Sequence, residues 1–360
     1  MKFLNILRIF TVLSFVLISC NPDNLGYEDK PLHNTTPEPD PVPTPDPGNK
    51  EDTDLSVKYP DPTTPKVKTL LVDGFFKETT IKKGITLYSV EKALEKDITN
   101  DYQTIFVLEI DLNNEDYKVE FYYGKSDTTS AIAVKNNAIA AVNACYELEA
   151  IYCKTNGVVH GTCDLAPDHL RFWKHEAAIV SDGARKIGII HGAKGTDNHV
   201  DGGKQALDVY KKLTEANIFA SAPMLIDDYK PVGATYVPAS YTSSALSKLE
   251  SEDWRRHQGV RHPRVAAALT EDNDLLLVVV DGRFSGKAAG MSAKELTNFL
   301  VKYFNPRWAI NMDGGGSSTM YIKGYGDPVN NVLNYPVDNK RWDHYGQRKR
   351  PSLFLIKSAK

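Results

Sequence analysis

The sequence has 360 residues, of which 41% are hydrophobic and 25% charged, and its formal net charge is -3 at pH 7. This length allows one large domain or two closely joined ones. The mild negative charge gives no basic face for a nucleic-acid backbone, so we do not expect a nucleic-acid partner.

Residues 1–19 have the composition of a secretory signal peptide. Lys2 and Arg8 stand among Phe, Leu, Ile and Val, and the apolar run is too short to span a bilayer. The run ends Leu-Ile-Ser before Cys20, which resembles the lipobox of bacterial lipoproteins and implies lipidation of Cys20. The alternative is an ordinary cleaved signal with an incidental cysteine. Either way we expect an exported protein, and loss of the two basic residues changes the net charge from -3 to -5.

Residues 20–65 are predicted to be a proline-rich tether. From Pro31 to Pro65 the chain carries ten of its twenty prolines, with almost no large apolar residues. Such a segment cannot bury enough surface to fold, and polyproline II-like chain is extended. We expect it to hold a folded domain, residues 66–360, away from a membrane. A recognition sequence for a proline-binding partner is the alternative.

Three cysteines remain in the folded part: Cys145, Cys153 and Cys163. Their spacings match no zinc template, and an exported protein meets an oxidising compartment. We therefore expect one disulfide and one buried free thiol, with the pairing left open.

The folded part begins with a predicted hairpin. Residues 102–112 and 117–123 are rich in β-branched and aromatic side chains, and the Asn-Asn-Glu-Asp sequence between them is typical of a turn. Further short apolar runs follow at 138–144, 176–181, 186–191, 218–226, 263–269, 274–281, 307–312, 318–323 and 352–357. Polar turns rather than helices separate most of them, which favours a mainly antiparallel or mixed sheet.

Helices are fewer than strands. The clearest extends from Ser292 to Phe304, where Ser292 and Glu295 are spaced as a capping box and the apolar residues share one face. Asn305-Pro306 ends it, and weaker candidates are 89–97, 203–214 and 241–256. The sequence thus predicts an α+β fold with a mainly antiparallel or mixed β-sheet core and a few flanking helices.

The densest functional signal is the run from Asn311 to Met320. An apolar strand delivers Asp313 to its end, Gly314, Gly315 and Gly316 follow, and Ser317 and Ser318 open the next strand. Three consecutive glycines cost conformational entropy on folding and pack no side chain. Their physical use is to bring bare backbone N–H groups close to an oxyanion or a phosphate, with the hydroxyls adding donors. A flexible turn is the alternative, but two glycines would suffice for it.

Three further polar clusters follow apolar strands or precede them. Asp281, Arg283 and Ser285 come directly after the strand ending at Val280, and the segment continues into the capped helix, whose N-terminus favours anions. Arg264 opens another strand, and its planar guanidinium suits a phosphate or carboxylate. Asn143 ends a strand of small residues and offers both a donor and an acceptor. Each alone is explained equally well by a turn or a surface salt bridge.

Together and in this order, these segments resemble the phosphodiester glycosidases. That family includes the lysosomal "uncovering enzyme", an N-acetylglucosamine-1-phosphodiester alpha-N-acetylglucosaminidase. The resemblance extends from about residue 87 to 356, and its most specific element is Asn-Met-Asp-Gly-Gly-Gly-Ser-Ser with Asp-Gly-Arg upstream. Residues 222–226 resemble the family's small-Gly-Pro-Leu-Val element, with Ala222 where glycine is common. The resemblance places Asn143, Asp281, Arg264, Arg283, Asp313, the glycines 314–316 and Ser317 around one site.

One departure from the family affects the first motif. The family has Asn-Gly-Gly-Phe/Tyr-Phe where this chain has Asn143-Ala144-Cys145-Tyr146-Glu147. Losing two glycines is expected to narrow the pocket or to bring Glu147 into it, which affects the substrate and the activity.

The resemblance implies a sugar joined through C1 to a phosphodiester. The arginines and the glycine amides then serve as a phosphate cradle, and a carboxylate beside C1 acts as base or nucleophile, Asp313 first and Asp281 second. Calcium or magnesium near these carboxylates is compatible with the chemistry, although the spacing demands no metal. Of the histidines, only His191, His199 and His262 attract attention, since no metal-binding His template is present.

The predicted function is thus a cell-envelope hydrolase acting on a carbohydrate or sugar-phosphate substrate and attached to the bacterial outer membrane or cell surface by its N-terminal lipid. The alternative is a surface glycan-binding lipoprotein that kept the fold and lost catalysis, favoured by the missing glycines after Asn143. A cell-envelope scaffold is a third class, favoured only by the tether.

Overall fold

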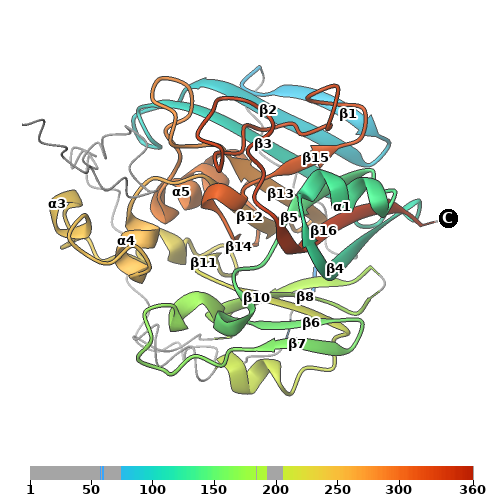
Figure 1. Cartoon of the computed structure of the whole chain (residues 1–360), viewed down its shortest axis with the longest axis horizontal. Coiled ribbons are helices and arrows are strands. Elements are labelled where there is room, and N and C mark those ends of the chain that lie inside the picture. Colours follow the sequence, from blue (N-terminus) through green and yellow to red (C-terminus); the bar gives the residue numbers. More distant parts are fainter. Residues whose placement is uncertain (1–56, 58, 61–73, 184, 193–205, 360) are drawn as a thin grey trace, which may run out of the picture.

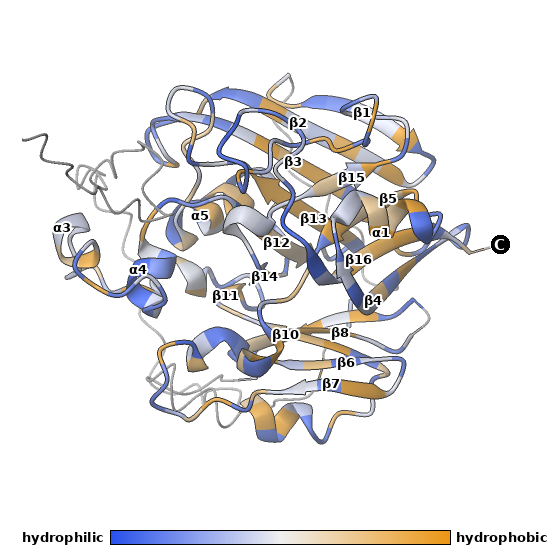
Figure 2. Ribbon diagram, in the orientation of Figure 1, coloured by the Kyte–Doolittle hydropathy of each residue, from blue (hydrophilic) through white to orange (hydrophobic). Residues whose placement is uncertain are grey.

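The computed structural model describes residues 57, 59–60, 74–183, 185–192 and 206–359. These residues form three β-sheets with short helices at their edges (Figure 1), and in each sheet every pairing of neighbouring strands is antiparallel. The predicted α+β class is therefore confirmed. Hydrophobic residues gather in the strands of all three sheets (Figure 2), and one large cluster of buried residues joins the sheets. Cys20 and His199 lie outside the described residues.

The largest sheet has seven strands in the order β1-β2-β3-β13-β12-β14-β11. Their bounds are β1 Lys77–Lys82, β2 Ile85–Ala93, β3 Tyr102–Asp111, β13 Asp274–Val280, β12 Arg264–Leu269, β14 Trp308–Met312 and β11 Met224–Ile226. The central strands are buried along their whole lengths because both faces are covered. One face packs on the large core cluster, and the other on the helix α5, Ala293–Tyr303.

Helix α5 begins where the sequence predicts. Ser292 accepts a hydrogen bond from the Glu295 N–H, and the Glu295 side chain accepts one from the Ser292 N–H, which completes a capping box. The helix ends at Tyr303, before Asn305-Pro306. Its apolar face contributes Leu296, Phe299, Leu300 and Tyr303 to the cluster beneath the seven-stranded sheet.

A four-stranded sheet, ordered β15-β5-β16-β4, supplies the other wall of the site. Its strands are β15 Met320–Ile322, β5 Ala140–Asn143, β16 Arg350–Ser358 and β4 Tyr117–Asp127, and helix α1, Thr129–Lys135, lies beside it. A five-stranded sheet, ordered β7-β6-β10-β8-β9, completes the fold. Its strands are β6 Tyr152–Thr155, β7 Val158–Thr162, β8 Ala177–Ser181, β9 Ile187–Ile190 and β10 Asn217–Ser221.

The predicted hairpin of residues 102–123 is wrong, although both strands exist. Strand β3 pairs with β2 and β13 in the seven-stranded sheet, whereas β4 pairs with β16 in the four-stranded sheet. The connecting residues form a local turn, in which the Asn114 N–H donates to the Asp111 carbonyl. They are also bound to the β12–β13 connection: the Leu112 N–H donates to the Asn273 carbonyl, and the Asn113 side chain donates to the Asp272 carbonyl. The turn residues correctly indicate that the chain changes direction after β3. However, β4 then pairs with β16, which lies more than 200 residues further along the sequence.

Three other local predictions differ from the structure. Residues 85–93 form β2, so the helix expected at 89–97 is absent. The run 218–226 is two strands in different sheets, separated at the cis peptide bond between Ala222 and Pro223. Within 241–256 only α3, Ser243–Leu246, and the start of α4, Trp254–Gly259, are helical, and of 203–214 residues 206–210 are described as helical.

Short 3-10 helices occupy several connections: η1 Leu148–Ala150, η2 Phe172–His175, η3 Val232–Ala234 and η4 Gly315–Ser317. The described end of the proline-rich segment lies against the domain. Val57 packs on the core, Pro60 is buried, and the Tyr59 hydroxyl donates to Glu215 Oε1 at 2.9 Å. In the described part of the chain, no helix is both long and apolar enough to cross a membrane.

Candidate active site

The site is organised around the end of β14, where two distant motifs are joined. Asn143, the last residue of β5, donates from Nδ2 to the Asp313 carbonyl at 2.7 Å and accepts at Oδ1 from the Thr319 N–H at 2.9 Å. The Asp313 N–H donates to the Ala144 carbonyl at 2.9 Å. The Asn143 side chain is fully buried, so these bonds fix both ends of the glycine turn on the four-stranded sheet.

The three glycines differ in what restricts them: backbone atoms crowd Gly314, a positive φ restricts Gly315, and the ends of two flexible side chains face Gly316. A Cβ at Gly314 would lie 2.6 Å from the Pro263 carbonyl oxygen, so this position needs close backbone approach. Gly315 has φ 60°, which L side chains seldom adopt. A Cβ at Gly316 would lie 2.5 Å from both the Arg348 guanidinium and the Asp338 carboxylate. The turn is therefore packed from both sides, by the segment before β12 and by the segment before β16.

Asp313 carries the central carboxylate, and its partner is Arg350, the first residue of β16. The distance between Arg350 Nε and Asp313 Oδ2 is 3.0 Å, and Arg350 also donates to the Cys145 carbonyl at 2.7 Å. Asp313 is only 7% exposed. Burial raises its pKa above the usual range, the guanidinium opposes that rise, and the nearby Glu147 carboxylate adds to it.

Glu147 lies beside this pair, as the altered first motif predicts. Its carboxylate is 3.0 Å from the ammonium of Lys174, which comes from η2 and is itself buried between Glu147 and Glu252. Burial alone would raise the Glu147 pKa, but the Lys174 charge and the hydrogen bonds from Lys174 and from the Glu147 backbone N–H together outweigh burial and lower the pKa to about 2. Two carboxyl groups with oppositely shifted pKa values therefore lie close together at this site.

Arg283 lies on the opposite side of the glycine turn. Its φ is 66°, and its Nη2 is 3.6 Å from the ideal Cβ position of Gly315 and 3.2 Å from His262 Nδ1. Burial and the Arg283 and Arg264 charges lower the His262 pKa well below its usual range, so His262 is neutral and its ring nitrogen can accept from Arg283. The structure thus brings Arg283 to the turn, as the sequence predicts.

The Arg264 Cα lies 3.3 Å from the ideal Cβ position of Gly314, but the Arg264 guanidinium is enclosed by protein. Nε donates to the Met291 carbonyl, Nη1 to Gln258, and Nη2 to the His257 and Val260 carbonyls, at 2.7–3.1 Å. The side chain is 1% exposed. Arg264 therefore holds the last turn of α4 against β12, and its donors are directed to that helix rather than to the glycines.

Asp281 supports the turn from below through Asn334. Its Oδ1 accepts from Asn334 Nδ2 at 2.8 Å, and Asn334 Nδ2 also donates to the Ser318 carbonyl at 3.0 Å. Asp281 Oδ2 accepts from the Tyr335 N–H at 3.0 Å. Burial raises the Asp281 pKa to about 7. The structure therefore connects Asp281 to the site through a hydrogen-bonded side chain, and Ser285 lies on an exposed loop.

The hydroxyl groups that follow the glycines are buried. The side chains of Ser318 and Thr319 are at most 1% exposed, and their oxygens have no hydrogen-bond partner among the described residues. Unsatisfied buried hydroxyls are uncommon and mark a place where a ligand or water supplies the partner. Within the same described ranges, no group of three or more His, Cys, Asp or Glu side chains is arranged to hold a metal ion.

The predicted disulfide is absent: Cys145, Cys153 and Cys163 are buried free thiols. Cys163 Sγ lies 3.3 Å from His175 Nδ1 instead.

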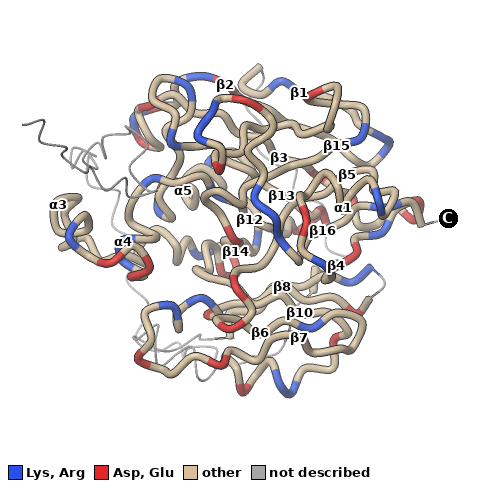
Figure 3. The backbone as a smooth tube through the Cα atoms, viewed as in Figure 1, with Lys and Arg blue, Asp and Glu red and all other residues tan. Residues whose placement is uncertain are grey.

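Sequence reasoning missed Arg350, Arg348 and Lys174. The basic run Arg348-Lys349-Arg350 directly before an apolar strand is the same kind of signal as Arg264 before β12, so it was available in the sequence. Lys174 had no such signal, because it lies in an irregular segment between β7 and β8. Figure 3 shows acidic and basic residues spread over the whole view, so local pairing rather than a charged face distinguishes the site.

Comparison with known proteins supports the fold at low sequence identity. The catalytic domain of zebrafish N-acetylglucosamine-1-phosphodiester alpha-N-acetylglucosaminidase, auto-inhibited by its pro-peptide, matches with a TM-score of 0.52 and 14% identity over 84% of this chain and 88% of that chain. A hypothetical protein from Synechocystis has a TM-score of 0.47 and 12% identity, covering 78% of this chain and 63% of that one. A putative exported protein from Burkholderia pseudomallei K96243 has a TM-score of 0.44 and 14% identity, covering 72% and 74%. No curated protein matches the sequence.

The family model described as phosphodiester glycosidase matches residues 130–357. This range contains Asn143, the glycine turn, the Asp281–Arg283 segment and Arg350. Because the match covers more than half of the chain, and because the site geometry joins the motifs on which the resemblance depends, this chain belongs to the phosphodiester glycosidase family.

Proposed function

We propose that the protein hydrolyses the bond between a sugar C1 and a phosphodiester, with an N-acetylglucosamine-1-phosphodiester-like substrate. The observation that carries this proposal is the buried Asp313 carboxylate, held 3.0 Å from Arg350 at the entrance of the triple-glycine turn. The zebrafish protein of similar fold is named for an activity of this class.

The chemistry asks for a carboxylate at the sugar and positive charge at the phosphate. In its ionised form Asp313 is the base or nucleophile beside C1. Burial raises the Asp313 pKa above its usual range, and the Arg350 guanidinium opposes that rise, so the ion pair favours the ionised carboxylate.

The phosphate side of the site is supplied by cations on both sides of the turn. A phosphate monoester leaves readily, so stabilising its charge matters more than protonating the departing oxygen. Arg350 and Arg283 are the proposed phosphate ligands, because each borders the glycine turn. Arg264 is a positioning residue through α4, and Asp281 is one through Asn334.

We further propose that the protein acts at the bacterial cell envelope, attached through a lipid on Cys20. The signal-like residues 1–19 and the proline-rich segment support this location. The second candidate function is a glycan-binding lipoprotein without turnover. One observation favours it: Glu147, which replaces an apolar residue of the family motif, is already bound to Lys174 beside Asp313.

The test is an assay of the full chain against N-acetylglucosamine-1-phosphodiesters and other sugar phosphodiesters, with and without EDTA. Release of free sugar, lost in Asp313→Asn with the melting temperature unchanged within a few degrees, supports the hydrolase. Residual activity above a few per cent in that variant removes Asp313 from the mechanism. Binding of the phosphodiester without any sugar release decides for the glycan-binding protein.

A further inference from the structure

Two histidines beside Arg283 each hold a hydrogen-bond donor that the proposed function does not use. His257 lies in α4, and His262 lies two residues before β12. Both side chains are partly exposed, and their ring centroids are 6.0 Å apart. The sequence drew attention to His262 only, because nothing in the pattern around His257 distinguishes it.

The contact with Arg283 determines which nitrogen of His262 carries the proton. Arg283 Nη2 lies 3.2 Å from His262 Nδ1, and a guanidinium can only donate. Nδ1 must therefore be the acceptor, which leaves the ring proton on Nε2. The backbone of His262 is bonded in both directions to Met291, so the position of the ring is well determined. Among the described residues, none accepts a hydrogen bond from His262 Nε2.

A chain of hydrogen bonds determines the tautomer of His257 in the same way. Arg264 Nη1 donates to Gln258 Oε1 at 3.1 Å, so the other end of the Gln258 amide, Nε2, is the end that faces His257. Gln258 Nε2 lies 2.9 Å from His257 Nδ1, and an amide nitrogen donates. Nδ1 is again the acceptor, and Nε2 again carries the proton. Nowhere in the described part of the chain does this second Nε2 find an acceptor.

The surroundings agree with two uncharged rings. Burial and the Arg283 and Arg264 charges lower the His262 pKa well below its usual range. Burial and the charges of Lys174 and of the same arginines lower the His257 pKa likewise. A neutral imidazole donates through one nitrogen and adds no charge of its own. The site therefore offers two neutral N–H donors next to its cations.

Ring contacts place the two histidines in a row that leads from Arg283 towards Lys174. The His257 ring centroid lies 6.0 Å from that of Tyr146. The Lys174 ammonium in turn lies 4.7 Å from the centre of the Tyr146 ring and binds Glu147 at 3.0 Å. The row thus connects the side of the site that carries Arg283 with the side that carries Glu147.

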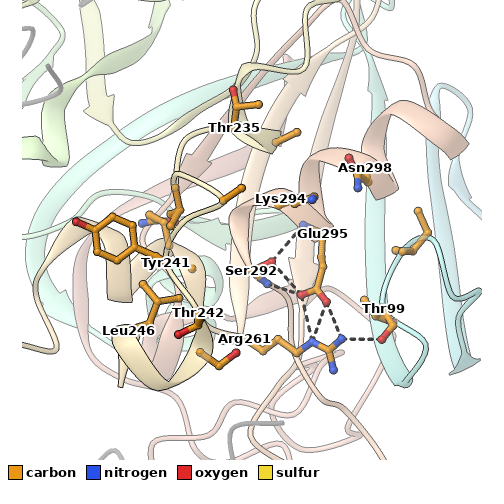
Figure 4. A pocket seen from close by; sticks show the side chains of 18 of the residues that line it. Thr99, Thr235, Tyr241, Thr242, Leu246, Arg261, Ser292, Lys294, Glu295 and Asn298 are labelled. Atoms are coloured by element: carbon orange, nitrogen blue, oxygen red, sulfur yellow. Dashed lines mark hydrogen bonds and ion pairs between the residues drawn. The ribbon is translucent and has the colours of Figure 1, made fainter. Parts of the chain in front are cut away.

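Helix α4 also borders a groove of about 900 Å³, which is separate from this row (Figure 4). Gln258 and Arg261 line the groove, and Arg261 is paired there with Glu295 at 2.6 Å. Neither histidine is among the residues that line it. The two Nε2 donors therefore belong with Arg283 and Tyr146 rather than with the groove.

We propose that His257 and His262 are substrate-binding residues, which donate from Nε2 to oxygen atoms of the sugar phosphodiester. This inference rests on the proposed function, because it requires the same substrate. Phosphodiester, hydroxyl and acetamido oxygens all accept from a neutral N–H, whereas an ammonium group cannot. The bond from Arg283 draws electron density from the His262 ring, which makes the opposite N–H a stronger donor.

Asparagine and glutamine separate the roles of the two ring nitrogens. An asparagine oxygen can take the place of Nδ1 as acceptor, but asparagine offers no donor at the place of Nε2. A glutamine amide can reach the place of Nε2 and donate, but it leaves the Nδ1 partner without an acceptor. For the methyl diester of N-acetylglucosamine-1-phosphate, we expect His257→Asn and His262→Asn each to raise KM about tenfold, with a smaller change in kcat. Each glutamine variant should raise KM less than the asparagine variant at the same position.

The matched control is His169→Asn. His169 is exposed, and its Nδ1 accepts from the Arg171 N–H at 3.1 Å, a bond that the asparagine oxygen can replace. This variant should have the KM of the parent. If the parent binds the diester without turnover, the dissociation constant takes the place of KM for every variant.

A second measurement does not depend on activity. Nitrogen-15 NMR of the labelled full chain, through correlations with the carbon-bound ring protons, identifies the protonated nitrogen of each imidazole. We expect His257 and His262 to be Nε2–H tautomers. Adding the methyl diester to Asp313→Asn, in which it should not be cleaved, is expected to shift both Nε2 resonances.

The proposal is overturned if either ring carries its proton on Nδ1 or if the asparagine variants keep the KM of the parent. It is also overturned if only the glutamine variants are impaired, since the rings would then serve to hold Arg283 and Gln258 in place. Any of these results in a parent that releases sugar would leave the proposed hydrolase intact. A parent that neither cleaves nor binds the diester would overturn both proposals.

Discussion

Asn143 and Asp313 are 170 residues apart, yet the Asn143 amide donates a 2.7 Å hydrogen bond to the Asp313 carbonyl. The same side chain accepts from Thr319 on the other side of the glycine turn. One buried amide thus determines the path of the chain that carries the Asp313 carboxylate.

Replacing Asn143 by alanine is expected to destabilise the protein and to reduce activity more than the stability loss explains. Two buried backbone groups lose their partners, which costs about 2–4 kcal/mol in the free energy of unfolding. Asn143→Asp keeps the acceptor for Thr319 but places a buried carboxylate against the Asp313 carbonyl, so its loss should be at least as large. Urea unfolding and sugar release measure the two effects. If folded Asn143→Ala kept full activity, the Asn143 amide would not be needed to position the Asp313 carboxylate.

Replacing Arg350 by methionine is expected to shift the pH dependence of activity. The guanidinium lowers the Asp313 pKa, so its removal raises that pKa, and the acidic limb of the rate profile moves to higher pH. At pH 7 we expect at least a tenfold loss, partly recovered at alkaline pH.

The control for Arg350 is Arg341→Met, which removes an exposed arginine from the same segment. It should leave the profile in place. A uniform loss of activity at every pH in Arg350→Met would instead assign this residue to substrate binding alone.

Alanine substitutions should distinguish the roles of the glycines, because the positions restrict a side chain in different ways. Gly315→Ala and Gly324→Ala both place alanine at positive φ, 60° and 81°, and each should cost about 1 kcal/mol of stability. Neither Cβ meets an atom closer than 3.6 Å. Only Gly315→Ala is expected to reduce sugar release, because Arg283 lies over that position.

Gly314→Ala should be the more damaging change in the same turn. Its Cβ would meet the Pro263 carbonyl at 2.6 Å, so the turn or β12 must move, with an expected cost of about 2 kcal/mol or more. Thermal unfolding of both variants checks the order. Equal stabilities for Gly314→Ala and Gly315→Ala would contradict it.

Deprotonation of His191 is expected to lower the free energy of unfolding as the pH rises above neutrality. It lies between Glu176 at 3.0 Å and Asp227 at 3.3 Å, which follow or precede strands of two different sheets. Burial lowers the His191 pKa, but the two carboxylates together outweigh burial and raise this pKa to about 9. Because this exceeds the unfolded value of about 6.5, the stabilisation is complete below pH 6.5 and is lost as pH rises through 9.

The measurement is the free energy of unfolding from pH 6 to 10 for the parent and His191→Gln. The difference between them should shrink by about 2–3 kcal/mol over this range. A constant difference would mean that the carboxylates do not hold a charged imidazole.

The sequence was most informative where one short segment determines its own structure. The capping box of α5 needs only Ser292 and Glu295, and both hydrogen bonds are present. The Asp-Gly-Gly-Gly run likewise located the site, since a simple turn does not need three consecutive glycines. The pairing of strands could not be predicted in this way. Residues 102–123 were predicted to be a hairpin because turn residues indicate that the chain reverses direction. They do not indicate which strand β4 pairs with.

The residues that form the site were equally hard to predict, because they are brought together by contacts between segments far apart in the sequence. Arg264 and Arg350 each stand before an apolar strand, and the sequence does not distinguish them. The direction of the side chains does: Arg264 points to α4 carbonyls, whereas Arg350 points to Asp313. Lys174 reaches Glu147 from a 3-10 helix that has no regular pattern, so only coordinates could place it.

The position of β16 near the end of the chain determines the order in which the fold and the site are completed during synthesis. It is inserted between β4 and β5, and its first residue delivers the cation to Asp313. During synthesis, the seven-stranded sheet has all its strands once residue 312 has emerged, but the carboxylate has no counter-charge until residue 350 docks. Nascent chains can therefore complete the seven-stranded sheet before Asp313 meets its counter-charge, and damage to this late strand would remove both a central strand of the four-stranded sheet and the cation of the proposed site.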